Sequence, residues 1–152
     1  MKDKIDEKEK QKLHDLINLL EGIKGRHTEL VTVMIPQGAN IFPVVRQLEG
    51  EKSTAANIKS KATRSAVIDS IEMILRELKK YKQTPPNGLA LFAGNVSDKE
   101  GVQDIQIWTV EPPKPLKVRT YRCDQVFVLE PLKEILDVQE VYRLLVMDRQ
   151  EA

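Results

Sequence analysis

The sequence predicts an α+β domain, in which helices pack on a mainly antiparallel sheet as a two-layer α/β sandwich. Apolar residues recur every three or four positions across residues 3–23 and 60–82, which is the spacing of amphipathic helices. Short apolar or alternating runs at residues 89–93 and 103–110 are typical of strands. The short glycine-containing connection between these two runs favours a hairpin, and therefore antiparallel pairing.

The first half of the chain opens with the predicted helix over residues 3–23. Gly25 follows its last apolar position and is expected to end it as a C-cap, because glycine readily adopts the conformation that such caps use. The next segment, residues 30–35, is a mostly branched apolar run that stops at Pro36. This run predicts a buried strand.

A pair of helices is predicted after that strand. Asn40 can cap a short helix, in which Pro43 is tolerated because it falls in the first turn. Small and hydroxylated residues at 53–56 compete for local backbone hydrogen bonds, so we expect a tight loop there. Ser60 can then cap a helix that runs to residue 82 and is roughly 30 Å long. The helix hairpin is expected to project its loop away from the core.

The remaining segments of the second half are predicted to be extended or briefly helical. Residues 116–122 are expected to be extended, residues 131–136 to form a short helix, and residues 141–147 to form a final apolar strand. The chain contains no internal repeat and no low-complexity tract. We therefore expect a single domain over residues 1–152.

Composition excludes several classes of protein. The 152 residues are 41% hydrophobic and 31% charged, which is typical of a globular domain. No apolar run is long enough for a transmembrane helix, and the one cysteine cannot form an internal disulfide, so we expect a cytoplasmic protein. Because the formal net charge is +1, any attraction for nucleic acid must come from a local patch.

The side chains that can carry chemistry favour binding over catalysis. His14 and His27 lack partners at the spacing of a metal site or a catalytic triad. The sequence has no glycine-rich phosphate loop, and Cys123 is more typical of a structural cysteine than of a nucleophile. We therefore expect no catalytic residue, no metal and no other cofactor.

The strongest signal for binding is the tetrapeptide Asn57-Ile58-Lys59-Ser60. Its surroundings are basic, with cations at Lys52, Lys59, Lys61 and Arg64. A basic loop with amide and hydroxyl groups suits phosphates, riboses and the edges of unpaired bases. The alternative is a solvated helix-hairpin turn that binds nothing.

Residues 121–127 offer a second candidate surface. Unpaired bases are read partly by stacking on aromatic rings, and this segment carries Tyr121 and Phe127. For both rings the alternative is packing in the core, and for Phe127 the two interpretations stay open. Arg122 and Asp124 beside Tyr121 favour a segment that reaches the surface.

Asn57-Ile58-Lys59-Ser60 resembles the signature loop of class-1 peptide-chain release factors of the archaeal and eukaryotic type. The segment Tyr121-Arg122-Cys123-Asp124-Gln125-Val126-Phe127 resembles the Tyr-x-Cys-x-x-x-Phe motif of that family, at the family's spacing from the loop. Residues 25–31 and 81–89 are also similar to the corresponding segments of the family. The resemblance covers essentially the whole chain as the N-terminal domain, and it favours an archaeal member.

The resemblance implies a role in translation termination, in which this domain recognises the stop codons UAA, UAG and UGA in the ribosomal decoding site. Asn57 and Lys59 would contact the first uridine, with Ile58 and Ser60 completing the loop. Glu51, just before the loop, would help to select purines at the next positions.

A purine-reading pocket would then be completed by Tyr121, Cys123 and Phe127. Three cations around the loop would contact ribosomal RNA or phosphate: Lys52, Lys61 and Arg64. Thr28 and Glu29 match a triplet that contributes to reading in the family. The triplet is His27-Thr28-Glu29 here, in which Glu29 agrees with archaeal members and His27 replaces a glycine.

In this family a middle domain with a Gly-Gly-Gln motif and a C-terminal domain follow. The sequence contains no Gly-Gly-Gln, so we expect it to be the N-terminal domain alone, without the part that triggers peptidyl-tRNA hydrolysis. The implied partners are the mRNA stop codon, small-subunit ribosomal RNA and, through the absent domains, a translational GTPase. We expect a monomer with no membrane partner.

A second class of function also fits these residues. The chain could be a stand-alone α/β module whose basic loop contacts ribosomal RNA or a protein without reading codons. Loop substitutions that weaken binding equally on all codons, and flatten its salt dependence, would favour that alternative.

Overall fold

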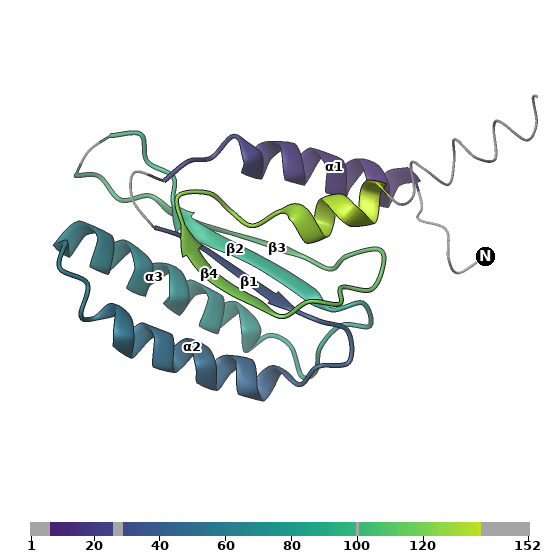
Figure 1. The fold of residues 1–152 in the computed structure, drawn as a ribbon, viewed down its shortest axis with the longest axis horizontal. Coiled ribbons are helices and arrows are strands. Elements are labelled where there is room, and N and C mark those ends of the chain that lie inside the picture. The colour runs from purple at the N-terminus through teal and green to yellow at the C-terminus, as the bar shows by residue number, and fades with distance from the viewer. Residues whose placement is uncertain (1–6, 26–28, 100, 138–152) are drawn as a thin grey trace, which may run out of the picture.

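Four strands form one antiparallel sheet in the computed structural model, which describes residues 7–25, 29–99 and 101–137. They are β1 (Leu30–Ile35), β2 (Leu89–Asn95), β3 (Ile105–Val110) and β4 (Thr120–Asp124), in the order β3-β2-β1-β4. Helices cover both faces of the sheet (Figure 1). The predicted α+β class, the antiparallel sheet and the hairpin of β2 with β3 are confirmed.

β1 is the central element of the sheet. It pairs with β2 on one side, where Val33 lies opposite Leu91, and with β4 on the other, where Val33 lies opposite Tyr121. All six of its residues are buried, because both of its edges are paired and both of its faces are covered. The strand has the bounds that its apolar run predicts.

Two antiparallel helices, α2 (Ile41–Ala55) and α3 (Lys61–Leu78), cover one face of the sheet. Alternate side chains of β1 point toward them, since successive residues of a strand face opposite ways. The core between the helices and the sheet includes Val31, Val33, Val44, Leu48, Ile71, Ile74 and Leu91. The predicted helix hairpin is therefore present, and the side of it that faces the sheet is buried in this core.

Helix α1 (Glu7–Glu21) and a helical segment at residues 130–137 cover the opposite face. A second core lies there, formed by Leu13, Ile17, Leu30, Met34, Phe92 and Leu132 among others. The arrangement has three layers, so the two-layer expectation was wrong. The reason lies in β1 and β2, whose runs are apolar at consecutive positions and so need cover on both faces.

The structure extends α2 through part of the segment that was expected to be a loop. Asn40 caps the helix as predicted, with its Oδ1 accepting from the N–H of Phe42 at 3.0 Å. Ser53 and Thr54 donate their hydroxyls to the carbonyls four residues earlier, at 3.2 and 3.1 Å, instead of ending the helix. Helical conformation therefore continues to Ala55, and the connection is shorter than expected.

Two other helix ends differ from the expectation. α1 ends at Glu21, and Gly25 is not its cap: the N–H of Gly25 donates to the carbonyl of Gln125 at 2.8 Å, which joins the end of that segment to the chain after β4. α3 ends at Leu78 rather than at residue 82. The strand expected at residues 141–147 lies outside the described residues.

Candidate nucleic-acid interface

The connection between α2 and α3 is a short turn that local hydrogen bonds hold. The N–H groups of Asn57 and Ile58 donate to the carbonyls of Thr54 and Ala55, both at 3.0 Å. Ser60 caps α3 as predicted, its hydroxyl accepting from the N–H of Thr63 at 3.3 Å. The turn is therefore continuous with both helices.

One side of this turn is attached to the molecule and the other faces solvent. Ile58 is half-buried against the core under α2 and α3, and its carbonyl accepts from the guanidinium of Arg64 at 3.0 Å. Asn57, Lys59 and Ser60 are exposed. The arrangement presents an amide and an ammonium group on a fixed backbone, beside the positive end of the α3 dipole.

Tyr121 and Cys123 of β4 lie on the same face of the sheet, against the core that Ile58 also contacts. The Tyr121 hydroxyl and the Cys123 sulfur are 3.1 Å apart. Burial raises the pKa of the Tyr121 phenol, the hydrogen bond to Cys123 raises it further, and the carboxylate of Glu51 adds to the effect. Burial also raises the pKa of the Cys123 thiol. Both groups are therefore neutral at pH 7 and able to donate or accept hydrogen bonds.

Glu51 lies on the last turns of α2 and is half-buried. Its carboxylate raises the pKa values of both Tyr121 and Cys123, so its negative charge reaches the pair across the helix–sheet boundary. A carboxylate accepts hydrogen bonds only. The three side chains thus combine one fixed acceptor with two groups that can act either way.

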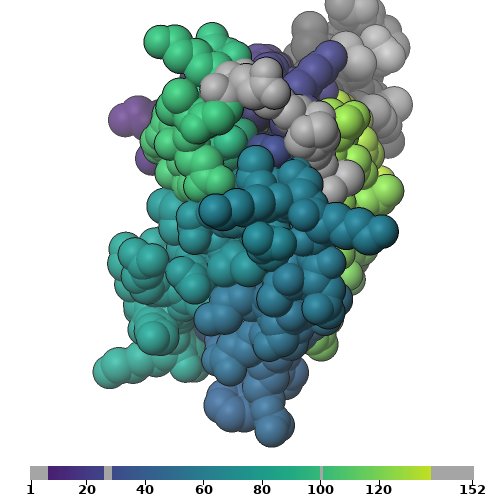
Figure 2. Space-filling model, turned by 90° about the vertical axis from the view of Figure 1, so that its left-hand side faces the viewer, coloured from purple at the N-terminus to yellow at the C-terminus, as the bar shows by residue number. Residues whose placement is uncertain are grey.

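The turn and β4 share one end of the molecule. In Figure 1 the α2–α3 turn and the C-terminal end of β4 lie at the left, together with the connection between β2 and β3. Gln103 in that connection donates to the carbonyl of Ala62 at 3.4 Å. Figure 2 looks onto this end, with the residues around the turn at the front and the β2–β3 connection above them.

The sequence of residues 8–137 matches the family model described as eRF1 domain 1, which is most of the chain. The chain belongs to the eRF1 domain 1 family. Its relatives include peptide chain release factor subunit 1 of Thermococcus kodakarensis, 51% identical over 144 residues, which cover 95% of this chain and 35% of the relative. The protein of that name from Pyrococcus abyssi is 53% identical over 136 residues, covering 90% of this chain and 33% of the relative.

A solved structure described as the archaeal translation termination factor aRF1 has the same fold. Its TM-score is 0.75 at 32% sequence identity, and the match covers 84% of this chain and 34% of that one. The chain therefore spans about a third of the length of the relatives that it matches. The named relatives are archaeal, as the resemblance of the motifs implies.

The structure of this eRF1 domain 1 does not bring Phe127 to Tyr121 and Cys123. Phe127 is 4% exposed and belongs to the core on the opposite face of the sheet. Its ring packs edge-on against Phe92, with centroids 5.5 Å apart, and against Trp108 at 6.1 Å. Phe127 was open to two interpretations, core packing and base stacking, and its contacts are those of a core residue.

The remaining predicted residues are placed as follows. Lys61 is exposed on the first turn of α3, whereas Lys52 is 3.8 Å from the carboxylate of Glu72 and Arg64 is bonded to the turn. Glu29 is buried at 4% exposure. Thr28 and His27 lie outside the described residues.

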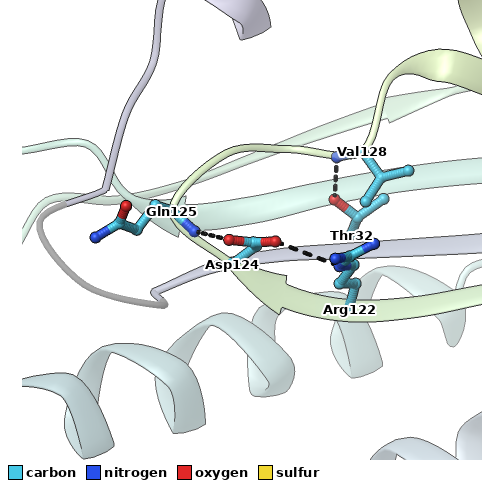
Figure 3. Close-up of polar contacts among 5 residues, drawn as sticks. All are labelled: Thr32, Arg122, Asp124, Gln125 and Val128. Carbon is cyan, nitrogen blue, oxygen red and sulfur yellow. Dashed lines mark hydrogen bonds and ion pairs between the residues drawn. The ribbon is translucent and has the colours of Figure 1, made fainter.

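Three contacts around β4 were missed from the sequence (Figure 3). Thr32 of β1 accepts from the N–H of Val128 at 3.0 Å, and Asp124 pairs with Arg122 at 3.3 Å while accepting from the N–H of Gln125 at 2.7 Å. These bonds fix the turn that follows β4. A hydroxyl inside the apolar run of residues 30–35 was the available signal, since a buried polar group requires a partner.

Within the described residues, no three histidine, cysteine, aspartate or glutamate side chains form a group that could hold a metal ion. None of the helices described is both long and apolar enough to cross a membrane.

Proposed function

We propose that this chain is the codon-recognition domain of an archaeal release factor, which reads UAA, UAG and UGA in the ribosomal decoding site. The observation that carries the proposal is the match to eRF1 domain 1 over residues 8–137. It is supported by the placement of the α2–α3 turn and the Tyr121–Cys123 pair on one face of the sheet. The relatives named peptide chain release factor subunit 1 point to the same process.

The exposed turn suits a uridine at the first codon position. Uracil presents a carbonyl acceptor at O4, where cytosine presents an amino donor. The Lys59 ammonium group can only donate, so it pairs with O4 and is repelled by the cytosine amino group. The Asn57 amide can both donate and accept, which suits the adjacent N–H and carbonyl of uracil.

Glu51, Tyr121 and Cys123 suit purines at the second and third positions. Adenine presents an amino donor at position 6 and guanine presents a carbonyl acceptor. A carboxylate accepts from the amino group, whereas a neutral hydroxyl or thiol can rotate to serve either base. In this proposal Phe127 acts indirectly, since its packing in the opposite core holds the chain that follows β4.

The finer parts of the proposal concern partners and location. The domain acts in the cytoplasm, contacts the mRNA stop codon and small-subunit ribosomal RNA, and performs no catalysis itself. In the full-length factor, a domain with a Gly-Gly-Gln motif triggers peptidyl-tRNA hydrolysis and a translational GTPase binds outside this domain. Lys61 is the exposed cation best placed for a phosphate contact, and Thr28 and Glu29 remain assigned to the reading triplet.

The test joins residues 1–152 to the remaining part of the Thermococcus kodakarensis relative. Peptide release is measured on ribosomes with each stop codon and with the near-cognate UGG. We expect release on the three stop codons only, and its loss in Lys59→Ala and Glu51→Gln. Lys117→Ala, an exposed lysine in the segment before β4, serves as the control and should leave release unchanged.

Release that ignores the codon, or that survives both Lys59→Ala and Glu51→Gln, would overturn codon reading. That outcome would support a docking module whose basic turn contacts ribosomal RNA or protein without discrimination. Equal weakening on every codon, with a smaller salt dependence, would identify the lost contacts as phosphate contacts.

A further inference from the structure

A groove of about 630 Å³ runs between α2 and α3, along the side of the helix pair that carries their exposed residues. It extends from Asn40 and Lys82 at one end to Glu72 of α3 and to Lys52 and Ser53, in the last turns of α2, at the other. Since α2 rises about 1.5 Å per residue, Phe42 lies roughly 20 Å along the helix from the turn at Asn57. The end of the groove beside Phe42 is thus remote from the turn, and the lining includes none of the residues assigned to codon reading.

The floor of this groove is apolar. Ile41 and Val45 of α2 and Leu75 and Leu78 of α3 line it. At its rim, Phe42 is 63% exposed, more than any other large hydrophobic side chain in the described part of the chain. An exposed aromatic ring beside an apolar groove is characteristic of protein-binding surfaces.

The rim of the groove is basic. Arg76, Lys79 and Lys82 line it at the end near Phe42, and none of the three is in an ion pair within the described residues. Of the two carboxylates that line the groove, Glu72 is paired with Lys52 at 3.8 Å. The free charge along the rim is therefore mainly positive.

A further cation is stacked on the exposed ring. The guanidinium of Arg46 lies 5.5 Å from the centroid of Phe42. This cation–π contact holds one face of the ring and places another positive charge beside the apolar floor. The apolar floor and the basic rim together suit a ligand with an apolar surface flanked by negative charge.

We propose that the α2–α3 groove binds an acidic amphipathic helix of a partner protein. Such a helix places apolar side chains three and four residues apart on the floor, next to Phe42, and its glutamates or aspartates against the basic rim. A phosphate backbone would satisfy the rim but gain nothing from Val45, Leu75 and their neighbours. This inference does not depend on codon reading, because it uses none of the residues assigned to it.

The test uses the 152-residue chain and a synthetic probe. The probe is an acidic helical peptide of about 15 residues, or four turns, with leucines at helical spacing and glutamates on both sides of them. Binding is followed through backbone amide NMR shifts and by calorimetry. We expect shifts confined to α2 and α3 around the groove, a Kd below about 100 µM, and weaker binding as salt rises.

Substitutions in the chain separate the two parts of the groove. Phe42→Ala and the double change Arg76→Glu with Lys79→Glu should each weaken binding at least about tenfold. Leu19→Ala removes another exposed large hydrophobic side chain, on α1 across the sheet, and Lys117→Glu changes the charge elsewhere. Both controls should leave the affinity unchanged.

Three results would overturn the proposal. The first is no binding of the acidic peptide at about 1 mM. The second is equal binding of a peptide with lysine in place of every glutamate. The third is binding of single-stranded oligouridine in the groove, weakened by the same substitutions, in the absence of peptide binding, which would make the surface an RNA contact.

Discussion

The hydroxyl of Thr32 in the central strand accepts a hydrogen bond from the backbone N–H of Val128 at 3.0 Å. Thr32 is fully buried, and Phe127, the neighbour of Val128, packs on Phe92 on the same side of the sheet. One side-chain oxygen in β1 thereby holds the turn that follows β4. The two residues are far apart in the sequence, so this contact depends on the finished fold.

Replacing Thr32 by valine should lower the stability of the fold, because it removes this hydrogen bond. Thr32→Val leaves the half-buried N–H of Val128 without its acceptor, which should cost about 1 kcal/mol of unfolding free energy in urea denaturation. Thr32→Ser keeps the acceptor and loses only a methyl group. Native-state hydrogen exchange at Val128 separates the two: we expect lost protection in Thr32→Val and retained protection in Thr32→Ser. Retained protection in both would contradict the assignment.

The cap of α3 gives a second prediction. Ser60→Ala removes the acceptor for the N–H of Thr63 and should lower the unfolding free energy by about 1 kcal/mol. Ser60→Asp retains a capping oxygen and adds a charge that suits the helix N-terminus, so its stability should match the parent. If Ser60→Asp were as unstable as Ser60→Ala, the hydroxyl would have some function other than capping.

Arg64 should control the order of the exposed turn. Its guanidinium bonds to the carbonyl of Ile58, so Arg64→Ala should speed amide exchange at Asn57 and Ile58 by about tenfold, or about 1.4 kcal/mol of local opening. Arg76→Ala is the matched control, because Arg76 is an exposed arginine on the same helix without an ion pair among the described residues. Unchanged exchange in Arg64→Ala would mean that the turn is held by its backbone bonds alone.

The Tyr121–Cys123 pair predicts a loss of stability at alkaline pH. Burial raises the pKa of each group in the folded state, so above the ordinary thiol pKa of 9.0 the unfolded chain releases protons that the folded chain retains. The unfolding free energy should therefore fall as pH rises through this range. Cys123→Ala should reduce the slope, and Tyr121→Phe should reduce the part that begins above 10.0, the ordinary value for tyrosine, where Tyr81 also contributes because burial raises its pKa. An unchanged slope in both variants would place the titration elsewhere.

Two glycines should respond in opposite directions to the same substitution. At Gly94 of β2 an added Cβ would lie 2.4 Å from a methyl carbon of Leu30 and 3.1 Å from the carbonyl oxygen of Glu29, so Gly94→Ala should destabilise the fold by about 1–3 kcal/mol. At Gly50, in the exposed side of α2, nothing lies within 4 Å, and Gly50→Ala should stabilise it by about 0.5–1 kcal/mol. Thermal unfolding of both variants checks the pair.

The sequence predicted the strands and helix ends that depend on interactions between residues close together in the chain. The run at residues 30–35 predicted β1, and Asn40 and Ser60 were recognised as helix caps. The end of α2 was placed too early, because Ser53 and Thr54 satisfy their hydroxyls on the preceding turn and let the helix continue. A serine or threonine hydroxyl can bond either to the preceding helical turn or to a loop backbone, and the sequence alone does not show which of the two it does.

The candidate site was predicted unevenly for a similar reason. The turn at 57–60 is local, and its exposure follows from the two helices beside it. Phe127 depends on the topology: the chain after β4 turns to the other face, where Thr32 and Phe92 hold it. No spacing within residues 121–127 reveals that change of face.

The central position of β1 has a consequence for synthesis of the chain. Val31 emerges early, yet its partners Ala93 and Cys123 are made much later. At about 5–20 residues per second, β1 waits roughly 5–20 s for β4, and it is apolar on both sides throughout that interval. The β2–β3 hairpin, by contrast, can close as soon as it emerges. The nascent segment in greatest need of shielding from aggregation is therefore the one that later organises both cores.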